Sequence, residues 1–280
     1  MDIASRLGLH ESLVEREYNL LITLEEFRTK GLMKGGDPLV LGGGHGVRAY
    51  LPQELQRFSI DLDFYSSVPD IHQTLKDLKR VGDVREVGYG IQEEKRFKRY
   101  DSAVPTDLRQ CTVALVRSYH QSFKLGDVPP EFSITVTNTH PPKSFEMRKP
   151  KSYISVDYVK GEIPVLPASQ IIAGKMQIIP HRPVKDLYKD IFDIYALMKL
   201  SDARVTRPEL VASLKEARVK LTPSILYERF KEASGADGAK NAIKLPKEAR
   251  RTYLDNWDGI HAFVKEETFA VMKAAGCLSD

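Results

Sequence analysis

The stretch Ile60-Asp61-Leu62-Asp63-Phe64 constrains the fold of this chain more than any other, because its residues alternate strictly. Successive side chains of a strand point to opposite faces of a sheet. The three apolar residues therefore predict a buried face, and Asp61 and Asp63 lie side by side on the other face. Two neighbouring carboxylates on a rigid strand suit a hard divalent cation, which takes oxygen ligands. The stretch predicts a β-strand that carries a site for Mg²⁺ or Mn²⁺.

A glycine cluster lies a short distance upstream of this strand. The apolar residues 39–41 lead into Gly42-Gly43-Gly44-His45-Gly46, and a helical segment follows. Glycines let backbone N–H groups approach a phosphate closely. The cluster therefore predicts a nucleotide-binding turn, with candidate contacts at Gly43, Gly44, His45 and Arg48. For His45 two interpretations are open, a nucleotide contact or a tolerated loop residue.

A third carboxylate lies in another alternating stretch, residues 153–159, which predicts a second strand with Asp157 on one face. If this strand neighbours the first, Asp157 completes a group of three carboxylates. Such a group can hold two divalent metals and position an attacking hydroxyl. The alternative is an exposed acidic residue on a strand.

Lys175 lies in the apolar segment 171–179. Lysines are rarely buried unless they are paired, so this side chain either extends to solvent or reaches a triphosphate as a point charge. Asp186, Asp190 and Asp193 follow at spacings of four and three residues, which places them on one face of a helix. They form a solvated acidic stripe or, in the functional interpretation, a face from which Asp190 pairs with Lys175 or acts as a base.

Length and composition indicate an ordinary globular protein. The chain has 280 residues, of which 42% are hydrophobic and 29% charged, and its net charge of +4 permits a polyanionic partner without requiring one. Cys111 and Cys277 lie far apart, which favours neither a zinc site nor a disulfide framework and indicates a reducing compartment. No apolar run is long enough to span a bilayer, and the N-terminus has no signal-peptide core. We therefore expect a cytoplasmic protein without a membrane partner.

Helix and strand signals predict an α+β fold in two parts. Helices are expected over residues 3–30 (with a break near 8–10), 69–78, 186–200, 207–218, 222–233 and 249–275. Further strands are expected over 84–87, 112–116, 132–136 and 153–159. The change from strand signals to helix signals near residue 165 predicts two domains, 1–166 and 167–280.

Several of these pieces together resemble the AbiEii/AbiGii-type nucleotidyltransferases, a family that includes toxins of toxin–antitoxin and abortive-infection systems. The matching pieces are GGHGVR at 43–48, RFSIDLDF at 57–64, AGKM at 173–176, Arg182, and KDIFDIY at 189–195. They agree in order and spacing. The resemblance implies a DNA polymerase beta-like nucleotidyltransferase core, which is a mixed sheet with flanking helices, followed by a C-terminal helical bundle.

The resemblance also implies roles for individual residues. Asp61 and Asp63 would hold the catalytic metal, with Asp157 as the third carboxylate. Lys175 would bind phosphate, and Asp190 would be a further active-site acid that can activate the acceptor hydroxyl.

Together these observations predict a metal-dependent nucleotidyltransferase that moves a nucleoside monophosphate from an NTP to a hydroxyl and releases pyrophosphate. The acceptor is expected to be a tRNA end or a protein hydroxyl, and the basic stretch 95–109 favours RNA. The family also implies a toxin with a cognate antitoxin.

Two alternatives stay open. One is a catalytically silent protein that binds a nucleotide or a partner. It is suggested by His45, because the family usually has a serine or threonine there that contacts the nucleotide phosphate. The other is a glycosyltransferase that uses its DxD to hold a nucleotide-sugar. Such enzymes need a nucleotide-binding α/β half before the DxD, and only about 60 residues precede it here.

Overall fold

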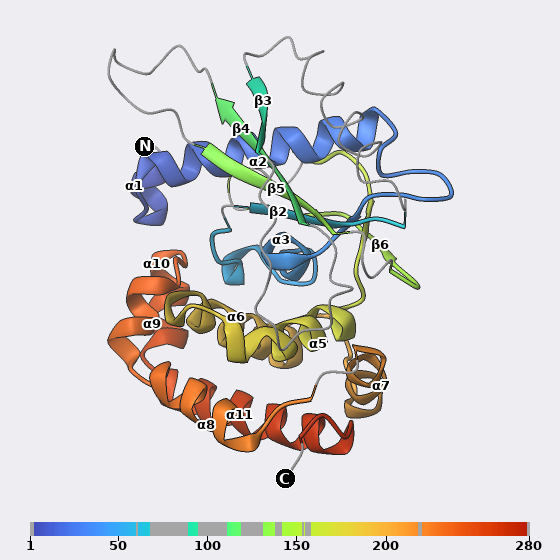
Figure 1. Ribbon diagram of the computed structural model, residues 1–280. Helices are drawn as coiled ribbons and strands as arrows, with labels where there is room; N and C mark the ends of the chain where they lie inside the picture. Colours follow the sequence, from blue (N-terminus) through green and yellow to red (C-terminus); the bar gives the residue numbers. More distant parts are fainter. Residues whose placement is uncertain are drawn as a thin grey trace. The chain divides into compact units, whose positions relative to one another are not determined.

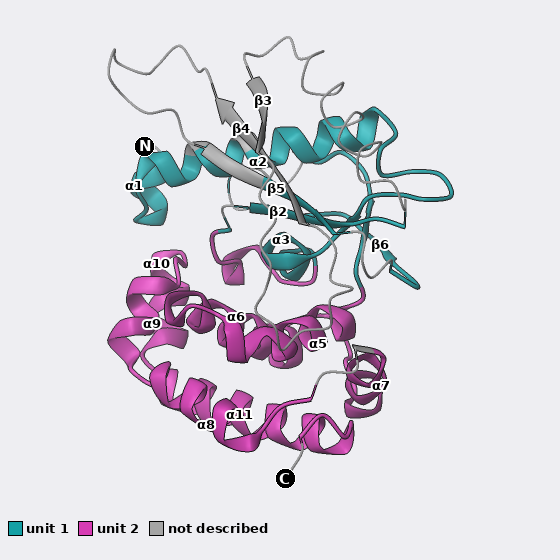
Figure 2. Ribbon diagram, in the orientation of Figure 1, with its two compact units in different colours: residues 1–49, 59–166 teal, residues 50–58, 167–280 magenta. Residues whose placement is uncertain are grey.

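The chain forms two compact units, residues 1–49 with 59–166 and residues 50–58 with 167–280 (Figure 2). The computed structural model describes residues 3–59, 61–67, 89–94, 111–118, 131–137, 142–152, 154, 158–217 and 220–278. The expected helix over 69–78, the strand over 84–87 and most of the strand over 153–159 lie outside these residues. The second unit includes the segment 50–58, which the predicted division at residue 166 places in the first domain.

The first unit contains a mixed β-sheet with helices (Figure 1). Its helical elements are α1 (Ile3–Leu7), α2 (Glu11–Thr29) and α3 (Gly43–Arg48). Its strands are β1 (Val40–Leu41), β2 (Asp61–Tyr65), β3 (Tyr89–Glu94), β4 (Cys111–Ser118), β5 (Glu131–Thr137), β6 (Glu146–Arg148) and β7 (Ile163–Val165). The strands expected over 112–116 and 132–136 are confirmed as β4 and β5.

The described strands form one sheet in the order β3-β4-β5-β2-β1-β7-β6. The pairs β2/β5 and β1/β7 are parallel, and the pairs β1/β2, β3/β4, β4/β5 and β6/β7 are antiparallel. The sheet is therefore mixed, as the sequence predicts, and β2 lies in its interior.

The helix α2 covers the sheet because its apolar residues recur on one face. Leu20, Leu21, Leu24 and Phe27 are all buried. The helix ends before Gly31, whose φ of +83° favours glycine. This confirms both the expected break before α2 and the expected stop after it.

The alternation in β2 is confirmed. Leu62 and Phe64 are fully buried, whereas Asp61 and Asp63 are half-buried. The ring of Phe64 packs against Phe27 of α2, with 5.6 Å between the ring centroids. The apolar face of β2 therefore lies toward α2, and the two aspartates lie on the opposite face.

The second unit is helical in its described part. Its elements are η1 (Gln53–Leu55), α5 (Ala168–Ile178), η2 (Ile179–His181), α6 (Val184–Lys199), α7 (Arg207–Ala217), α8 (Pro223–Glu232), α9 (Ala236–Ala242), α10 (Lys247–Ala249), η3 (Arg250–Leu254) and α11 (Trp257–Ala274). The helices expected over 186–200, 207–218 and 222–233 are confirmed as α6, α7 and α8. None of the helices in the described part of the chain is long and apolar enough to cross a membrane.

The single helix expected over 249–275 is wrong. The short α10 passes into a π-helical turn, η3, and α11 begins at Trp257. Ala249 and Leu254 are both buried although they are five residues apart, a spacing that an i→i+5 turn brings onto one face. No proline or glycine marks this turn, so the sequence pattern did not reveal it.

The core of the second unit includes the chain's only tryptophan, Trp257. It is fully buried, its Nε1 donates to the Ala233 carbonyl at 3.1 Å, and its ring lies 5.6 Å from that of Tyr188 on α6. Tyr188 in turn lies against Gly238 of α9, where a Cβ atom would be 2.2 Å from the Tyr188 hydroxyl. A side chain at position 238 would therefore displace the Tyr188 ring.

We expect Gly238→Ala to lower the free energy of unfolding by about 1–3 kcal/mol, because the added methyl group forces Tyr188 away from Trp257. Gly174→Ala in α5 is the matched control, since a Cβ there meets nothing within 4 Å. It should stabilise by about 0.5–1 kcal/mol because alanine is the better helix former. Urea titrations followed by Trp257 fluorescence would measure both. Equal midpoints for the two variants would contradict the expected close packing.

Candidate active site

Asp63 lies directly against the glycine turn. The Gly42 N–H donates to the Asp63 carbonyl at 2.7 Å. Gly43 has a φ of +55°, and a Cβ atom on it would be 1.9 Å from Asp63 Oδ2. Only glycine meets both conditions, the left-handed backbone and the absence of a side chain. The turn therefore leaves room for the Asp63 carboxylate.

The donor atoms on β2 fit a hard divalent cation. Asp61 and Asp63 supply carboxylate oxygens on one face of the strand. Mg²⁺ in phosphate-transferring sites is often held by one or two carboxylates and completes its shell with water and substrate oxygens. Among the described residues, no group of three or more His, Cys, Asp or Glu side chains is placed to hold a metal. Asp157, the predicted third carboxylate, lies outside the described residues.

His45 and Arg48 on α3 point into the first unit, with only 4% and 3% of their surfaces exposed. His45 Nδ1 lies 2.8 Å from the Asp61 carbonyl oxygen, and its Nε2 lies 3.2 Å from Arg48 Nη1. The polar atoms of both side chains bind protein groups. The sequence had instead predicted nucleotide contacts for both residues. Gly44 is buried within α3.

The partner of Arg48 is Glu17, a fully buried residue of α2. The guanidinium makes two hydrogen bonds to the carboxylate, one of them 2.6 Å long, and the Ser152 hydroxyl donates to the same carboxylate at 3.2 Å. Burial opposes ionisation of Glu17, but the attraction of Arg48 outweighs it and holds the pKa of Glu17 below its ordinary value. Glu17 is therefore a carboxylate near neutral pH, and it pairs with the Arg48 cation.

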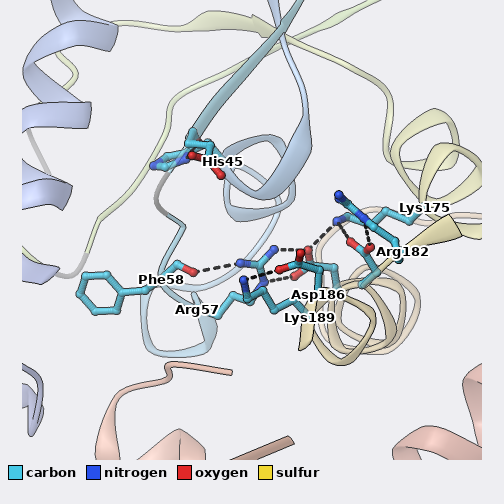
Figure 3. A network of polar contacts seen from close by, with 10 residues as sticks. His45, Arg57, Phe58, Lys175, Arg182, Asp186 and Lys189 are labelled. Atoms are coloured by element: carbon cyan, nitrogen blue, oxygen red, sulfur yellow. Dashed lines mark hydrogen bonds and ion pairs between the residues drawn. The ribbon is translucent and has the colours of Figure 1, made fainter. Parts of the chain in front are cut away.

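A network of five charged side chains lies in the second unit (Figure 3). Lys175 Nζ is 2.6 Å from Asp190 Oδ1 and 2.8 Å from Asp193 Oδ2. Arg57 donates twice to the Asp193 carboxylate, at 2.6 and 2.5 Å, and Arg182 Nε donates to Asp190 at 2.8 Å. The predicted pairing of Lys175 with Asp190 is confirmed.

The alternative of a solvated acidic stripe is wrong for Asp190 and Asp193, which are both buried. They lie on the face of α6 that packs on α5, whereas Asp186 is partly exposed and pairs with Lys189 at 2.8 Å. Of the three acids on this helix face, Asp190 and Asp193 are therefore in the core and Asp186 is at the surface.

The surrounding charges hold Asp190 and Lys175 in the ionised form. Burial disfavours the charged form of Asp190, but Lys175 and Arg182 outweigh it and lower the pKa of Asp190. Burial likewise disfavours charged Lys175, but Asp190 and Asp193 outweigh both burial and the repulsion of Arg57, so the pKa of Lys175 is raised. The pair is a carboxylate and an ammonium over the whole physiological range.

Sequence reasoning missed Arg57 and Asp193 as site residues. Arg57 Nη1 also donates to the Phe58 carbonyl at 2.9 Å, and the Phe58 N–H donates to the Lys244 carbonyl at 2.8 Å. These contacts hold the segment 50–58 in the second unit, although it lies between the glycine turn and β2 in sequence. A signal was present in the arginine that opens the piece RFSIDLDF, but its partner is 136 residues away.

The fold and these two groups of residues define the class of protein. A mixed sheet with paired strand aspartates beside a glycine turn, followed by helices with a buried lysine–aspartate pair, is the arrangement that the sequence predicted for a nucleotidyltransferase. The sequence model of the family described as nucleotidyl transferase AbiEii toxin, type IV TA system, matches residues 31–253. The chain belongs to this family of nucleotidyltransferase toxins, as the sequence predicted.

A solved structure shares the fold. The nucleotidyltransferase toxin MenT4 from Mycobacterium tuberculosis H37Rv is similar with a TM-score of 0.65, over 98% of this chain and 92% of that one, at 15% sequence identity. The likeness confirms the predicted α+β fold with its C-terminal helical region. No curated protein matches the chain.

The network predicts unequal effects when single charges are removed. Its three cations and two carboxylates become balanced when Lys175 is replaced, but two positive charges stay in excess when a carboxylate is lost. We expect Asp190→Asn to lower the free energy of unfolding by about 3–5 kcal/mol, and Lys175→Met to lower it by less. Urea titration at pH 7 would measure both, with Asp255→Asn in the exposed Lys240–Asp255 pair as the control. A larger loss for Lys175→Met would contradict this charge balance.

The effect of Asp190 should depend on pH. Its pKa in the folded protein lies below the ordinary value of 3.8. A carboxyl group of this kind stabilises fully above the pKa of the unfolded state, and the stabilisation is lost as the pH falls through the folded pKa. The difference in unfolding free energy between wild type and Asp190→Asn should therefore be constant near neutral pH and shrink below about pH 4.

Proposed function

We propose that this chain transfers a nucleoside monophosphate from an NTP to a hydroxyl group, with release of pyrophosphate, at a site that uses Mg²⁺ or Mn²⁺. One observation carries the proposal: Asp61 and Asp63 share a half-buried face of β2, and Gly43 leaves space for the second carboxylate. Paired carboxylates on a rigid strand can hold the cation that assists a displacement at phosphorus.

Asp61 and Asp63 would hold the cation, and Asp157 is proposed as a third ligand. When bound, the cation neutralises charge on the triphosphate and lowers the pKa of the acceptor hydroxyl. Gly43 and Gly44 are the proposed sites of close backbone approach to the nucleotide. His45 is not proposed as a nucleotide contact because both of its ring nitrogens lie against protein groups, and Arg48 is not because its guanidinium binds Glu17 and faces His45.

Lys175 is proposed as the phosphate-binding cation. An ammonium has three N–H donors, and the contacts with Asp190 and Asp193 account for two of them. The five side chains of the network also carry one positive charge in excess, which suits an anionic ligand. Asp190 is a poor candidate for a general base, since its lowered pKa makes it a weak proton acceptor. We propose instead that it positions Lys175.

RNA is the proposed acceptor class, with tRNA as its first candidate. The second unit has 20 Lys and Arg residues against 16 Asp and Glu, whereas the first has 22 of each. The positive excess of the chain therefore resides in the unit that contains Lys175, and a positive excess favours a polyanion. The basic stretch 95–109 lies outside the described residues. Membership of a toxin family supports a cognate antitoxin and a site of action in the cytoplasm, where NTPs and tRNA occur.

A transfer assay tests the proposal. The purified chain would be incubated with Mg²⁺ or Mn²⁺, each of the four α-labelled NTPs, and total tRNA or cell extract. We expect label on RNA, reduced by at least about 100-fold in Asp61→Asn and Asp63→Asn because each removes a metal ligand worth several kcal/mol. Asp37→Asn, in an exposed turn of the same unit, is the control. Binding of NTP without label on RNA or protein would instead support the catalytically silent alternative.

A second variant tests the fit of Asp63 in the turn. We expect Gly43→Ala to reduce transfer to the level of Asp63→Asn. A φ of +55° is unfavourable for alanine, and the added methyl group would displace the Asp63 carboxylate. Gly36→Ala is the control, since a Cβ there meets nothing within 4 Å. Initial rates for the two variants would be compared with the wild type. Wild-type transfer by Gly43→Ala would rule out the proposed use of this space.

A further inference from the structure

We propose that His45 is a positioning residue for the metal-binding strand. It holds the backbone of Asp61 through its Nδ1–H group, and the Arg48–Glu17 pair holds the ring in the orientation that allows this contact. The inference rests on the proposed function for the role of the Asp61 carboxylate, but the contact itself is a property of the first unit.

The position of His45 follows from the shortness of β1. That strand pairs with β2 at only two positions, Val40 with Tyr65 and Leu41 with Phe64. The Gly42 N–H then extends the ladder by one hydrogen bond, to the Asp63 carbonyl. The next carbonyl along the same edge of β2 is that of Asp61, because carbonyls two residues apart in a strand point the same way.

The chain beyond Gly42 has already turned into α3, so its backbone does not continue alongside β2. The imidazole of His45 occupies the place of the next backbone donor, with Nδ1 at 2.8 Å from the Asp61 carbonyl oxygen. The Asp63 carbonyl is thus bound by the Gly42 N–H, and the Asp61 carbonyl is bound by the His45 side chain. Both donors come from the glycine turn.

The partners of His45 determine which ring nitrogen donates toward β2. A carbonyl oxygen only accepts a hydrogen bond, so Nδ1 must donate to the Asp61 carbonyl. On the other side of the ring, Nε2 lies 3.2 Å from Arg48 Nη1 and 3.9 Å from Glu17 Oε2. These two buried groups hold the ring in the orientation that presents Nδ1 to β2.

Arg48 is itself fixed by the two hydrogen bonds to Glu17, and Ser152 donates to that same carboxylate. A continuous series of buried contacts therefore leads from α2 through Glu17, Arg48 and His45 to the Asp61 backbone. Such outer contacts set the orientation of metal ligands, which must be held to within about 0.5 Å for a productive site.

Three substitutions of His45 separate the two contacts. Asn places an N–H group near the position of Nδ1 but does not reach Arg48. Gln places an acceptor near the position of Nε2 but no donor near Nδ1. Leu removes both contacts and keeps a similar volume. His261→Leu is the matched control, because the Nε2 of His261 contacts the Phe230 carbonyl at 2.7 Å in the second unit.

The two readouts are Mn²⁺ affinity, measured by electron paramagnetic resonance, and hydrogen exchange of the Leu62 amide, which shares a peptide group with the Asp61 carbonyl. Exchange at Phe64 serves as the reference for any global change in stability. We expect His45→Gln and His45→Leu to weaken Mn²⁺ binding about 10-fold or more, as loss of outer contacts does at other metal sites, and to accelerate exchange at Leu62 relative to Phe64. His45→Asn and His261→Leu should behave like the wild type in both readouts.

Mn²⁺ affinity and Leu62 exchange at wild-type levels in His45→Leu would overturn the proposal. Wild-type values in His45→Gln together with weakened Mn²⁺ binding and faster exchange in His45→Asn would also overturn it. The two proposals fail separately. If the wild type binds Mn²⁺ no more tightly than Asp61→Asn, the proposed metal site is wrong, and the exchange series still decides whether His45 holds the strand.

Discussion

The fit of the Asp63 carboxylate against Gly43 is the constraint on which the first unit's candidate site depends. The carboxylate occupies the volume that any side chain at position 43 would take, and the backbone there has a φ that favours glycine. At Gly43 the chain turns out of the two-residue strand β1 and enters α3. This early departure places α3 beside β2, brings His45 to the Asp61 carbonyl and turns Arg48 toward Glu17. One local requirement thus determines several longer contacts.

The buried charges of the second unit point to function more than to stability. Removing the four buried charged groups of the network from water is costly, and replacing a buried ion network by apolar residues is often neutral or stabilising. Lys175, Asp190 and Asp193 are nevertheless all buried and paired. Arg57 uses the same network to hold the segment 50–58, which continues directly into β2. The network thus contains a candidate phosphate-binding lysine and also fixes this segment. These two roles explain the buried charges better than packing does.

Local sequence patterns predicted what depends on neighbours in the chain. The alternation of β2, the ends of α2 and the helices α6 to α8 follow from periodicity and from turn residues, and the pairing of Lys175 with Asp190 followed from an unusual lysine in an apolar segment. The contact of Arg57 with Asp193 joins residues 136 positions apart, and no local pattern indicates it. The π-helical turn before α11 was missed for a related reason, because the burial of Leu254 depends on the surrounding helices.

His45 shows how one residue changes meaning between sequence and structure. In the sequence it replaces the small hydroxyl residue usual in this family, and it was the main argument for a catalytically silent protein. In the structure its ring turns away from solvent and binds the Asp61 backbone on one side and Arg48 on the other. A side chain directed into the protein is not the phosphate contact that the serine or threonine of the family provides. If His45 supports the strand as proposed, the substitution gives the site a different internal support and is no argument for a silent protein.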